Sequence, residues 1–351
     1  MTTKIKVSKA KKSKIKDVDF ENFSFGSVFT DHMFECDYVN GKWENPAIRP
    51  YEKISIEPSA SVFHYGQAIF EGMKAFKDDN NNVFLFRPNE NFERINKSAI
   101  RMSIPQIERN LFFSAVEQLV NLDKDWIKKG EGKSLYIRPF IVATDYAIQA
   151  VASQNYKFMI ICAPATLYYT KKLRVLIADK YSRAASGGFG YAKAAGNYAG
   201  QFYPTNLAKK SGFDQVIWTD SNEHKYIEEA GTMNIFFRID NELYTAPTTD
   251  TILDGVTRKS IIEIAKNNGI SVNIKKISVQ EIISASNEKR LKEIFGTGTA
   301  AIVSQVSGFQ YKDEYFEVKD QHDSYAELLK TKLLNIQTNQ SKDPLGWRYK
   351  I

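Results

Sequence analysis

The sequence predicts a protein of two mixed α/β domains. A length of 351 residues corresponds to about two domains. Segments with strand-like composition alternate with segments of helical spacing, as in layered α/β folds. No internal repeat or long linker separates them. We expect a basic disordered tail at residues 1–18, a smaller N-terminal domain at 19–164, an interdomain linker at 165–173 and a larger C-terminal domain at 174–351.

In the N-terminal half, the apolar run Val83–Phe86 predicts a strand that the following Arg87-Pro88-Asn89 interrupts. Asn91 is then expected to cap a helix, because apolar residues recur at helical spacing from Phe92 onward. The other expected elements of this half are a helix near 112–129 and strands near 134–143 and 157–163.

The C-terminal half is expected to open with a strand and a loop rich in Gly and Ala, followed by a helix that ends near Lys210. Its later elements again alternate between the two patterns. They are strands near 173–178, 215–219, 234–239, 242–245 and 293–295, and helices near 258–268 and 324–338.

The formal net charge of +7 comes from the N-terminal tail. Residues 1–16 contain seven lysines and no acid, and without them the remaining 41 basic residues equal the 41 acidic ones. A neutral body argues against a nucleic-acid partner, and a run of like charge is typical of a solvated, disordered arm.

No secretory signal or stretch of eighteen apolar residues is present in the sequence, so no membrane partner is expected. The two cysteines, Cys36 and Cys162, form neither a disulfide framework nor a metal motif. A reducing cytoplasm and a metal-free site are the simplest expectations.

Lys193 lies in a loop of small residues, 187–198, that leads into an expected helix. A lysine held there has little room to reach water, and burial would favour the neutral amine that forms Schiff bases. A carboxylate of the segment 227–234, which contains Glu228 and Glu229, could keep a pyridine nitrogen protonated. Taken singly, a surface lysine and a solvated acidic turn explain these segments as well.

Two Gly-containing segments could bind a phosphate. Gly255 directly precedes a helix, whose first N–H groups and dipole favour an anion. Residues 296–300 follow a strand and offer backbone N–H groups and two hydroxyls. Ordinary turns remain the alternative for both. The spacing of a dinucleotide-binding motif is absent.

An aromatic segment, residues 63–76, could line an apolar substrate pocket or form part of the core. His64 within it is expected to be structural, and the other histidines lie in no catalytic pattern, which argues against Ser-His or metal chemistry.

Together, seven segments in this order resemble the branched-chain amino acid aminotransferases, class IV enzymes with the fold-type IV architecture. The similarity extends from about Phe25 to Trp347. The matching segments are FHYGQAIFEGMKAF (63–76), FRPNENFERINKSAIRM (86–102), LYIRPF (135–140), KAAGNY (193–198), IEEAGTMNIF (227–236), LDGVTR (253–258) and FGTGTA (295–300).

This resemblance implies pyridoxal 5′-phosphate (PLP) as cofactor and Lys193 as the Schiff-base lysine. Tyr198 would bind the phenolic oxygen and Glu229 the pyridine nitrogen. The implied phosphate ligands are Arg94, Val256, Thr257 and Thr299, and Thr232, Leu253 and Gly255 complete the cofactor-binding set. The implied substrate-binding residues are Tyr65, Phe70, Tyr136, Tyr168, Thr299 and Ala300, with Arg138 serving the acidic substrate.

The implied reaction moves an amino group between leucine, isoleucine or valine and 2-oxoglutarate, in a homodimer with the site between the two domains. A D-amino-acid aminotransferase or an aminodeoxychorismate lyase shares the fold, and a non-catalytic binding protein with a basic anchoring tail is the alternative from another class. The sequence does not rank the three branched amino acids or the direction of flux.

Two positions differ from the family. Ala301 and Ser304 replace a Cys-x-x-Cys pair that some relatives carry, so a thiol switch is not expected there. Glu228 stands where relatives often have Ser or Thr, which places a second carboxylate beside Glu229.

Overall fold

The computed structural model describes residues 4–166 and 168–351. The chain divides into two compact units. The first runs to Tyr168 and also contains Ala192–Gly196 and Asn335–Ile351, whereas the second comprises Tyr169–Tyr191 and Asn197–Leu334. The expected single boundary near residues 165–173 is therefore too simple, because two later segments return to the first unit. Residue 167 of that expected linker lies outside the described residues.

Within the described residues, the first unit contains a nine-stranded sheet in the order β1-β3-β2-β8-β7-β5-β6-β18, with β4 beside β7. The strands are β1 (Lys6–Val7), β2 (His32–Val39), β3 (Lys42–Pro50), β4 (Ala68–Phe70), β5 (Met73–Lys77), β6 (Val83–Phe86), β7 (Ser134–Ala143), β8 (Tyr156–Ala165) and β18 (Arg348–Lys350).

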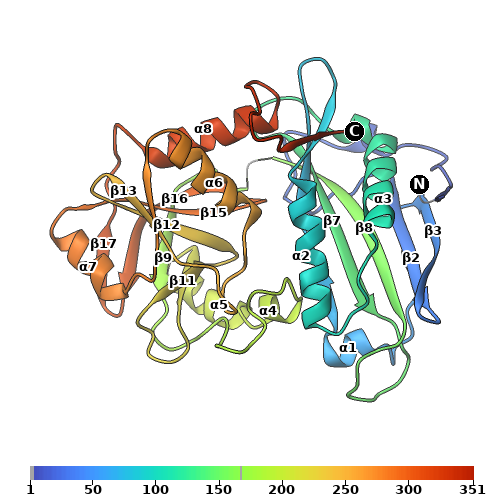
Figure 1. Cartoon of the computed structure of the whole chain (residues 1–351), viewed down its shortest axis with the longest axis horizontal. Helices are drawn as coiled ribbons and strands as arrows, with labels where there is room; N and C mark the ends of the chain where they lie inside the picture. The colour runs from blue at the N-terminus through green and yellow to red at the C-terminus, as the bar shows by residue number, and fades with distance from the viewer. Residues whose placement is uncertain (1–3, 167) are drawn as a thin grey trace. The chain divides into compact units, whose positions relative to one another are not determined.

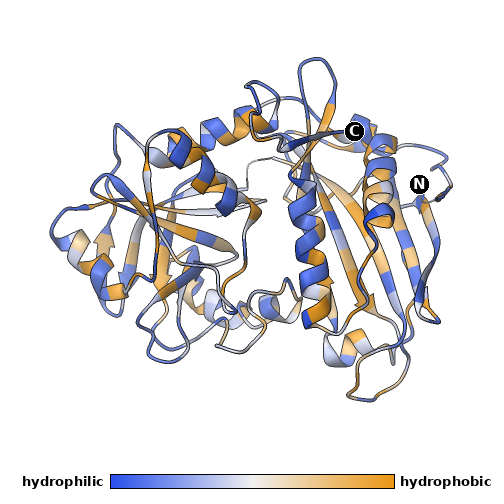
Figure 2. Ribbon diagram, in the orientation of Figure 1, coloured by the Kyte–Doolittle hydropathy of each residue, from blue (hydrophilic) through white to orange (hydrophobic). Residues whose placement is uncertain are grey.

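Helices α2 (Pro88–Arg101) and α3 (Arg109–Leu122) lie along one face of this sheet, as Figure 1 shows. Phe112 of α3 packs on Phe158 of β8, with ring centroids 6.5 Å apart, and Phe158 in turn meets Phe34 of β2. The strands are mostly apolar and the helices carry polar residues on the side facing the viewer (Figure 2). Burial of the apolar helix face against the sheet therefore holds this layer together. The shorter helices are α1 (Ser61–Tyr65), η1 (Ile15–Asp17) and η2 (Lys124–Trp126).

Helix α2 begins at Pro88, three residues before the expected cap. Arg87 precedes it in a left-handed conformation, with φ of 49°, and Pro88 occupies the first turn, where a missing N–H costs nothing. Asn91 is instead buried inside the helix, where its amide donates to Glu71 Oε2 at 2.8 Å. The prediction of an Asn91 cap was wrong, because a tertiary contact uses that side chain.

The basic segment is not a disordered arm over residues 4–18. Strand β1 pairs in parallel with β3, and Ser8 N donates to Ile48 O at 2.8 Å. Further along, the Ser13 hydroxyl and the Lys14 amide both donate to Asp31, at 2.5 and 2.8 Å. Main-chain hydrogen bonds do not depend on side-chain charge, so the lysines can stay solvated while their backbone is ordered. Residues 1–3 of the expected tail lie outside the described residues.

The second unit contains six strands that close into a ring, in the order β11-β10-β9-β16-β15-β12 and back to β11. Three further described strands extend the sheet: β13 pairs with β12, β14 pairs with β13, and β17 pairs with β16. The strand bounds are β9 (Leu173–Ile177), β10 (Gln215–Thr219), β11 (Ile227–Ala230), β12 (Met233–Ile239), β13 (Glu242–Thr245), β14 (Ser271–Ile274), β15 (Leu291–Gly298), β16 (Ile302–Tyr311) and β17 (Glu314–Glu317).

Several helices bury apolar residues against these strands. The core joins alternate residues of the strands, such as Leu173, Val175 and Ile177, to Ile282 of a helix. Alternation at a period of two places these strand residues on one face. The helices are α4 (Gly196–Ala199), α5 (Phe202–Lys210), α6 (Val256–Asn267), α7 (Val279–Asn287) and α8 (Tyr325–Gln337).

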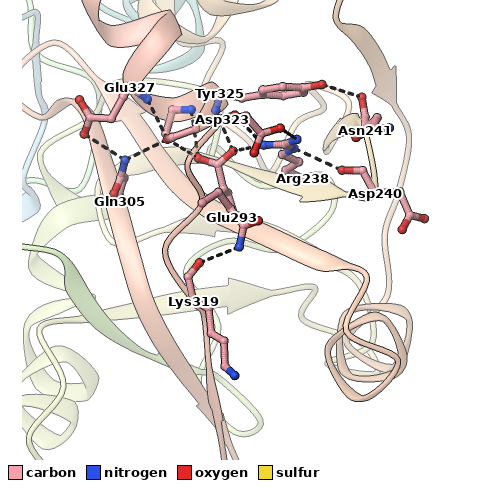
Figure 3. A network of polar contacts seen from close by, with 12 residues as sticks. Arg238, Asp240, Asn241, Glu293, Gln305, Lys319, Asp323, Tyr325 and Glu327 are labelled. Carbon is pink, nitrogen blue, oxygen red and sulfur yellow. Dashed lines mark hydrogen bonds and ion pairs between the residues drawn. The ribbon is translucent and has the colours of Figure 1, made fainter.

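The start of α8 is held by a buried carboxylate from β15. Glu293 accepts hydrogen bonds from the amides of Tyr325 and Ala326, at 2.8 and 3.2 Å, and from the hydroxyl of Ser324 at 2.5 Å. Arg238 of β12 lies 3.2 Å from Glu293, and its guanidinium covers the Tyr325 ring at 3.7 Å (Figure 3). The first N–H groups of an α-helix have no hydrogen-bond partner within the helix. Glu293 supplies the acceptor for two of these groups in α8, and its negative charge suits the N-terminal end of the helix dipole.

We expect Arg238→Met to destabilise the protein by about 3–5 kcal/mol, because Glu293 would remain buried without its cation. Equilibrium unfolding in urea measures the change. Arg290→Met is the matched control, since Arg290 also pairs with acids, Asp240 and Glu288, but at an exposed site where ion pairs contribute little. Equal losses in both variants would contradict the role given to burial.

Candidate active site

Lys193 lies beside strand β4 of the first unit. Its amide donates to Ser98 Oγ at 2.9 Å, and its carbonyl accepts from the Phe70 amide at 3.0 Å. Ala194, the next residue, bridges to Ile69. The backbone is thus fixed around Lys193, and the amine lies 4.8 Å from the centre of the Phe70 ring.

The environment of Lys193 favours a neutral amine. Burial is the largest cause and the Arg94 guanidinium adds to it, so the pKa falls from 10.5 to about 8, although the Glu71 carboxylate acts in the opposite direction. Although the residue as a whole is only half-buried, its amine group is removed from water, and this loss of solvation lowers the pKa. A neutral amine is the nucleophile that a carbonyl group requires.

Glu71 and Arg94 form a buried ion pair in the same unit. Arg94 Nε and Nη2 donate to the two carboxylate oxygens at 2.6 and 2.9 Å, and the Glu71 side chain is fully buried. Burial by itself would raise the pKa of Glu71, but the charge and hydrogen bonds of Arg94 and the charge of Lys193 hold it below 4.5. The guanidinium predicted to bind phosphate is therefore already oriented by Glu71.

Arg138 and Tyr136 project from the same face of β7, as their spacing predicted. Arg138 Nη2 donates to the Tyr136 hydroxyl at 2.9 Å, and the guanidinium lies 4.5 Å from the centre of the Phe70 ring. Within the part of the chain that the structure describes, the buried Nε of Arg138 has no hydrogen-bond partner. An unsatisfied cationic donor of this kind fits an anionic ligand.

The aromatic residues expected around the substrate are brought together only in part. Phe25 joins Tyr136 and Tyr168, with ring centroids 5.0 and 5.2 Å away. Gly72 is needed beside them, because a Cβ there would come within 2.2 Å of the Tyr136 hydroxyl. Tyr65 instead lies on α1 and is 44% exposed.

In the second unit, Glu229 is buried on β11 and accepts from two sides. Its Oε1 accepts from the Leu253 amide at 2.7 Å and from the Asn234 amide group at 3.3 Å, and Oε2 lies 3.0 Å from Arg183 Nε. The Leu253 amide, expected among the cofactor ligands, thus contacts the carboxylate directly. Arg183 thus places a positive charge beside this carboxylate.

Glu228, the unusual neighbour of Glu229, points the other way. Successive side chains of a strand lie on opposite faces, and Glu228 Oε1 accepts from the Thr251 hydroxyl at 2.6 Å. Glu228 and Glu229 therefore point in opposite directions, although the charge of Arg183 acts on both carboxylates.

Gly255 stands at the start of α6, where a side chain would not fit. An added Cβ would come within 2.0 Å of Asn234 Oδ1. Among the described residues, no side chain of the N-cap position caps this helix, so the amides of the first turn, at Val256 and Thr257, are placed to bind an anion.

The remaining predicted residues occupy turns and a short helix of the second unit. Thr299 and Ala300 are half-buried after β15, Thr232 is exposed in the turn between β11 and β12, and Tyr198 is half-buried on α4. Thr297, one of the two hydroxyl residues expected in the segment 296–300, carries a buried hydroxyl without a hydrogen-bond partner among the described residues.

Sequence reasoning missed four polar residues that the structure places around the predicted ones: Ser98, Glu71, Asn91 and Arg183. Glu71 had a usable signal, since it is the single acid of the apolar segment 63–76. Ser98 and Arg183 had none, because their contacts join segments far apart in the chain.

Comparison with known proteins defines the class first. The family described as amino-transferase class IV matches residues 68–309. The fold resembles the branched-chain aminotransferase of Thermoproteus uzoniensis solved with norvaline, at a TM-score of 0.74 and 23% identity over 91% of this chain and 99% of that one. The Escherichia coli branched-chain amino acid aminotransferase is similar at a TM-score of 0.73 and 24% identity, over 91% and 98%.

Relatives with higher sequence identity define the family within this class. The chain is 44% identical to branched-chain-amino-acid transaminase 1 of Bacillus subtilis over 95% of both chains. It is 42% identical to branched-chain-amino-acid aminotransferase 2 of the same organism, over 100% of this chain and 97% of the relative. The chain belongs to the class IV aminotransferases, in the branched-chain aminotransferase family. The fold and family expected from the sequence are thus confirmed.

Proposed function

We propose that this protein is a PLP-dependent aminotransferase that moves the amino group between leucine, isoleucine or valine and 2-oxoglutarate. The observation that carries the proposal is the group around Phe70: an amine shifted toward neutrality on Lys193, an aromatic wall, and an Arg138 with an unsatisfied donor among the described residues. An apolar side chain suits the wall, and a second carboxylate suits the arginine. Family membership supports the same reaction.

The residues fit PLP as cofactor. Lys193 offers an amine that loses its proton more readily than an exposed lysine, and the buried Thr297 hydroxyl and the first-turn amides of α6 are suited to an anion such as a phosphate. A solved branched-chain amino acid aminotransferase of the same fold was crystallised with N-(5′-phosphopyridoxyl)-L-glutamate; the match covers 90% of this chain and 97% of that one, at 24% identity and a TM-score of 0.71.

The predicted cofactor-binding residues would contact different parts of PLP. Lys193 would carry the cofactor, and Glu229, held by Arg183, would keep a proton on the pyridine nitrogen. Tyr198 would donate to the phenolic oxygen, and Thr232, Leu253 and Gly255 would shape the binding site. The phosphate would be bound by Arg94, Val256, Thr257 and Thr299.

PLP, when bound, supplies the carbonyl that joins an amino group and the ring that accepts negative charge. The amine of Lys193, once released, would take the proton from the substrate α-carbon and return it at the cofactor C4′. Phe70, Tyr65, Tyr136 and Tyr168 would exclude water around the side chain. Thr299 and Ala300 would bind the α-carboxylate, and Arg138 the γ-carboxylate of glutamate.

We further propose a homodimer that works in the cytoplasm on free amino acids and 2-oxo acids, without nucleic-acid or membrane partners. Among the described residues, no helix is long and apolar enough to cross a bilayer. Light scattering coupled to size-exclusion chromatography tests the dimer: the mass of a single 40.0 kDa chain would refute it.

The direct test of function is a panel of amino donors with 2-oxoglutarate, followed by the formation of glutamate and of the 2-oxo acid. Leucine, isoleucine and valine should react, whereas D-amino acids should not. Turnover of D-alanine with none of L-leucine would identify a D-amino-acid aminotransferase instead, and a purified protein that binds no PLP would support a binding protein.

The rate at which PLP attaches to the cofactor-free protein should rise with pH and level off above about 8. The cause is the lowered pKa of Lys193, since only the neutral amine reacts. Stopped-flow absorbance follows the attachment. In Glu71→Gln the levelling should move to lower pH, because Glu71 raises the pKa of Lys193. A rate that still climbs at pH 10, as for an exposed lysine with a pKa of about 10.4, would contradict this.

A further inference from the structure

A cavity of about 580 Å³ lies on the second unit, on the side of β11 that carries Glu228. Its walls include Ile227, Pro247 and Ile252 as apolar residues, beside Tyr226 and Thr251. The volume falls within the range of small-molecule sites. The residues proposed for PLP do not line it, so the proposed function leaves it without a role.

Glu228 lines the cavity and is the residue on which a charged ligand would depend. The residue is 8% exposed and its Oε1 accepts from Thr251, but its Oε2 is buried and has no hydrogen-bond partner within residues 4–166 and 168–351. Burial is the main cause of its raised pKa and the charges of Asp220 and Asp250 add to it, whereas the hydrogen bond from Thr251 and the charge of Arg183 act in the opposite direction. A buried acceptor without a donor is costly, and a bound cation would remove that cost.

The other charges of the cavity restrict what this cation can be. Asp220 is satisfied by four backbone amides, at Asn222, Glu223, Lys225 and Tyr226. No group of His, Cys, Asp and Glu among the described residues has the arrangement of a metal site. An organic ammonium group, which needs few acceptors, is therefore the better match for Glu228.

Two lysines line the same cavity and suit the opposite charge. The ammonium groups of Lys225 and Lys276 lie over the Tyr226 ring, 5.2 and 5.4 Å from its centre. A ligand with a cation at one end, an anion at the other and a short apolar part would meet Glu228, this lysine pair and the apolar wall.

We propose that this cavity binds a free α-amino acid, with the ammonium group on Glu228 and the carboxylate on Lys225 and Lys276. The site is separate from the reaction proposed above. It is nevertheless connected to it, because the Thr251 carbonyl accepts from Arg183 Nη2, and Arg183 Nε pairs with Glu229. Binding would therefore give the enzyme a way to sense amino-acid supply.

The test measures binding without turnover. Reduction of the PLP-loaded full chain with borohydride blocks the reaction site, and equilibrium dialysis then follows radiolabelled leucine. One equivalent should bind to the unmutated protein. Glu228→Gln, which preserves the shape, should weaken binding by about tenfold or more, since a charge-assisted hydrogen bond is lost. The double variant Lys225→Gln, Lys276→Gln should also weaken it.

Glu314→Gln, which changes an exposed acid on β17, is the matched control and should bind as the unmutated chain does. Isoamylamine, which is leucine without its carboxylate, should bind more weakly than leucine. No binding by the reduced protein, unchanged binding in Glu228→Gln, or equal affinity for isoamylamine would each overturn the proposal. A rise in the melting temperature of the unmutated reduced protein with leucine is a second measurement that depends on no variant. The reduction also reports on the proposed function, because a chain that takes up no PLP fails there first.

Discussion

Lys193→Ala should lower transamination by at least about 10⁴-fold, because the variant loses both the nucleophile and the group that moves the proton. The fold should survive, since an alanine at this position keeps the backbone contacts that Lys193 makes to Ser98 and Phe70. Turnover of leucine with 2-oxoglutarate and a circular dichroism spectrum measure the two effects.

Lys74 is the matched control for this variant. It is 4% exposed on β5, and burial lowers its pKa to about 8 as well. Lys74→Met should nevertheless retain turnover, and borohydride reduction of the unmutated protein should label the peptide that contains Lys193. A label on Lys74 would assign the chemistry to a different lysine.

Arg138→Gln should slow the glutamate half-reaction by roughly 10- to 150-fold and the leucine half-reaction much less. The γ-carboxylate of glutamate would lose a charge-assisted contact of about 1.5–3 kcal/mol, whereas leucine brings no such group. The unsatisfied Nε of Arg138 among the described residues supports this role. Single-turnover spectra of the two cofactor forms follow each half-reaction.

Arg49→Gln is a suitable comparison, because Arg49 is also a paired arginine of the first sheet but binds Glu35 and Glu52 instead of lining the Phe70 group. It should affect both half-reactions equally and weakly. If Arg138→Gln slowed both halves by the same factor, Arg138 would be holding the site together and would not select the substrate.

Local sequence patterns located eight of the described strands, β6 to β10, β12, β13 and β15, but gave no strand for others such as β5, β11 and β16. Ser134–Ala143, Gln215–Thr219 and Glu242–Thr245 were expected with the bounds that the structure has, because apolar β-branched runs between breakers leave few alternatives. Helix α7 was missed although it carries a capping box, with Ser278 Oγ accepting from Glu281 N and the Glu281 side chain accepting from Ser278 N. That signal was readable in the sequence.

The other errors have a common physical origin in contacts between distant segments. The basic segment is ordered by pairing with β3, and charge alone gives no information about such a partner. The Glu71–Arg94 pair and the opposite orientations of Glu228 and Glu229 depend on which elements the fold brings together. The roles assigned to the site residues all stay predictions.

The placement of β18 has a consequence for how the protein is made. Arg348–Lys350 pairs with β6 and completes an edge of the first sheet, although it follows the whole second unit in the chain. During synthesis the ribosome therefore releases the second unit before the first can close that edge. The first unit must wait with β6 unpaired on one side, a state prone to association with other chains. Ala192–Gly196, which carries Lys193, reaches the first unit earlier in translation, so the site lysine can be in place before the sheet is complete.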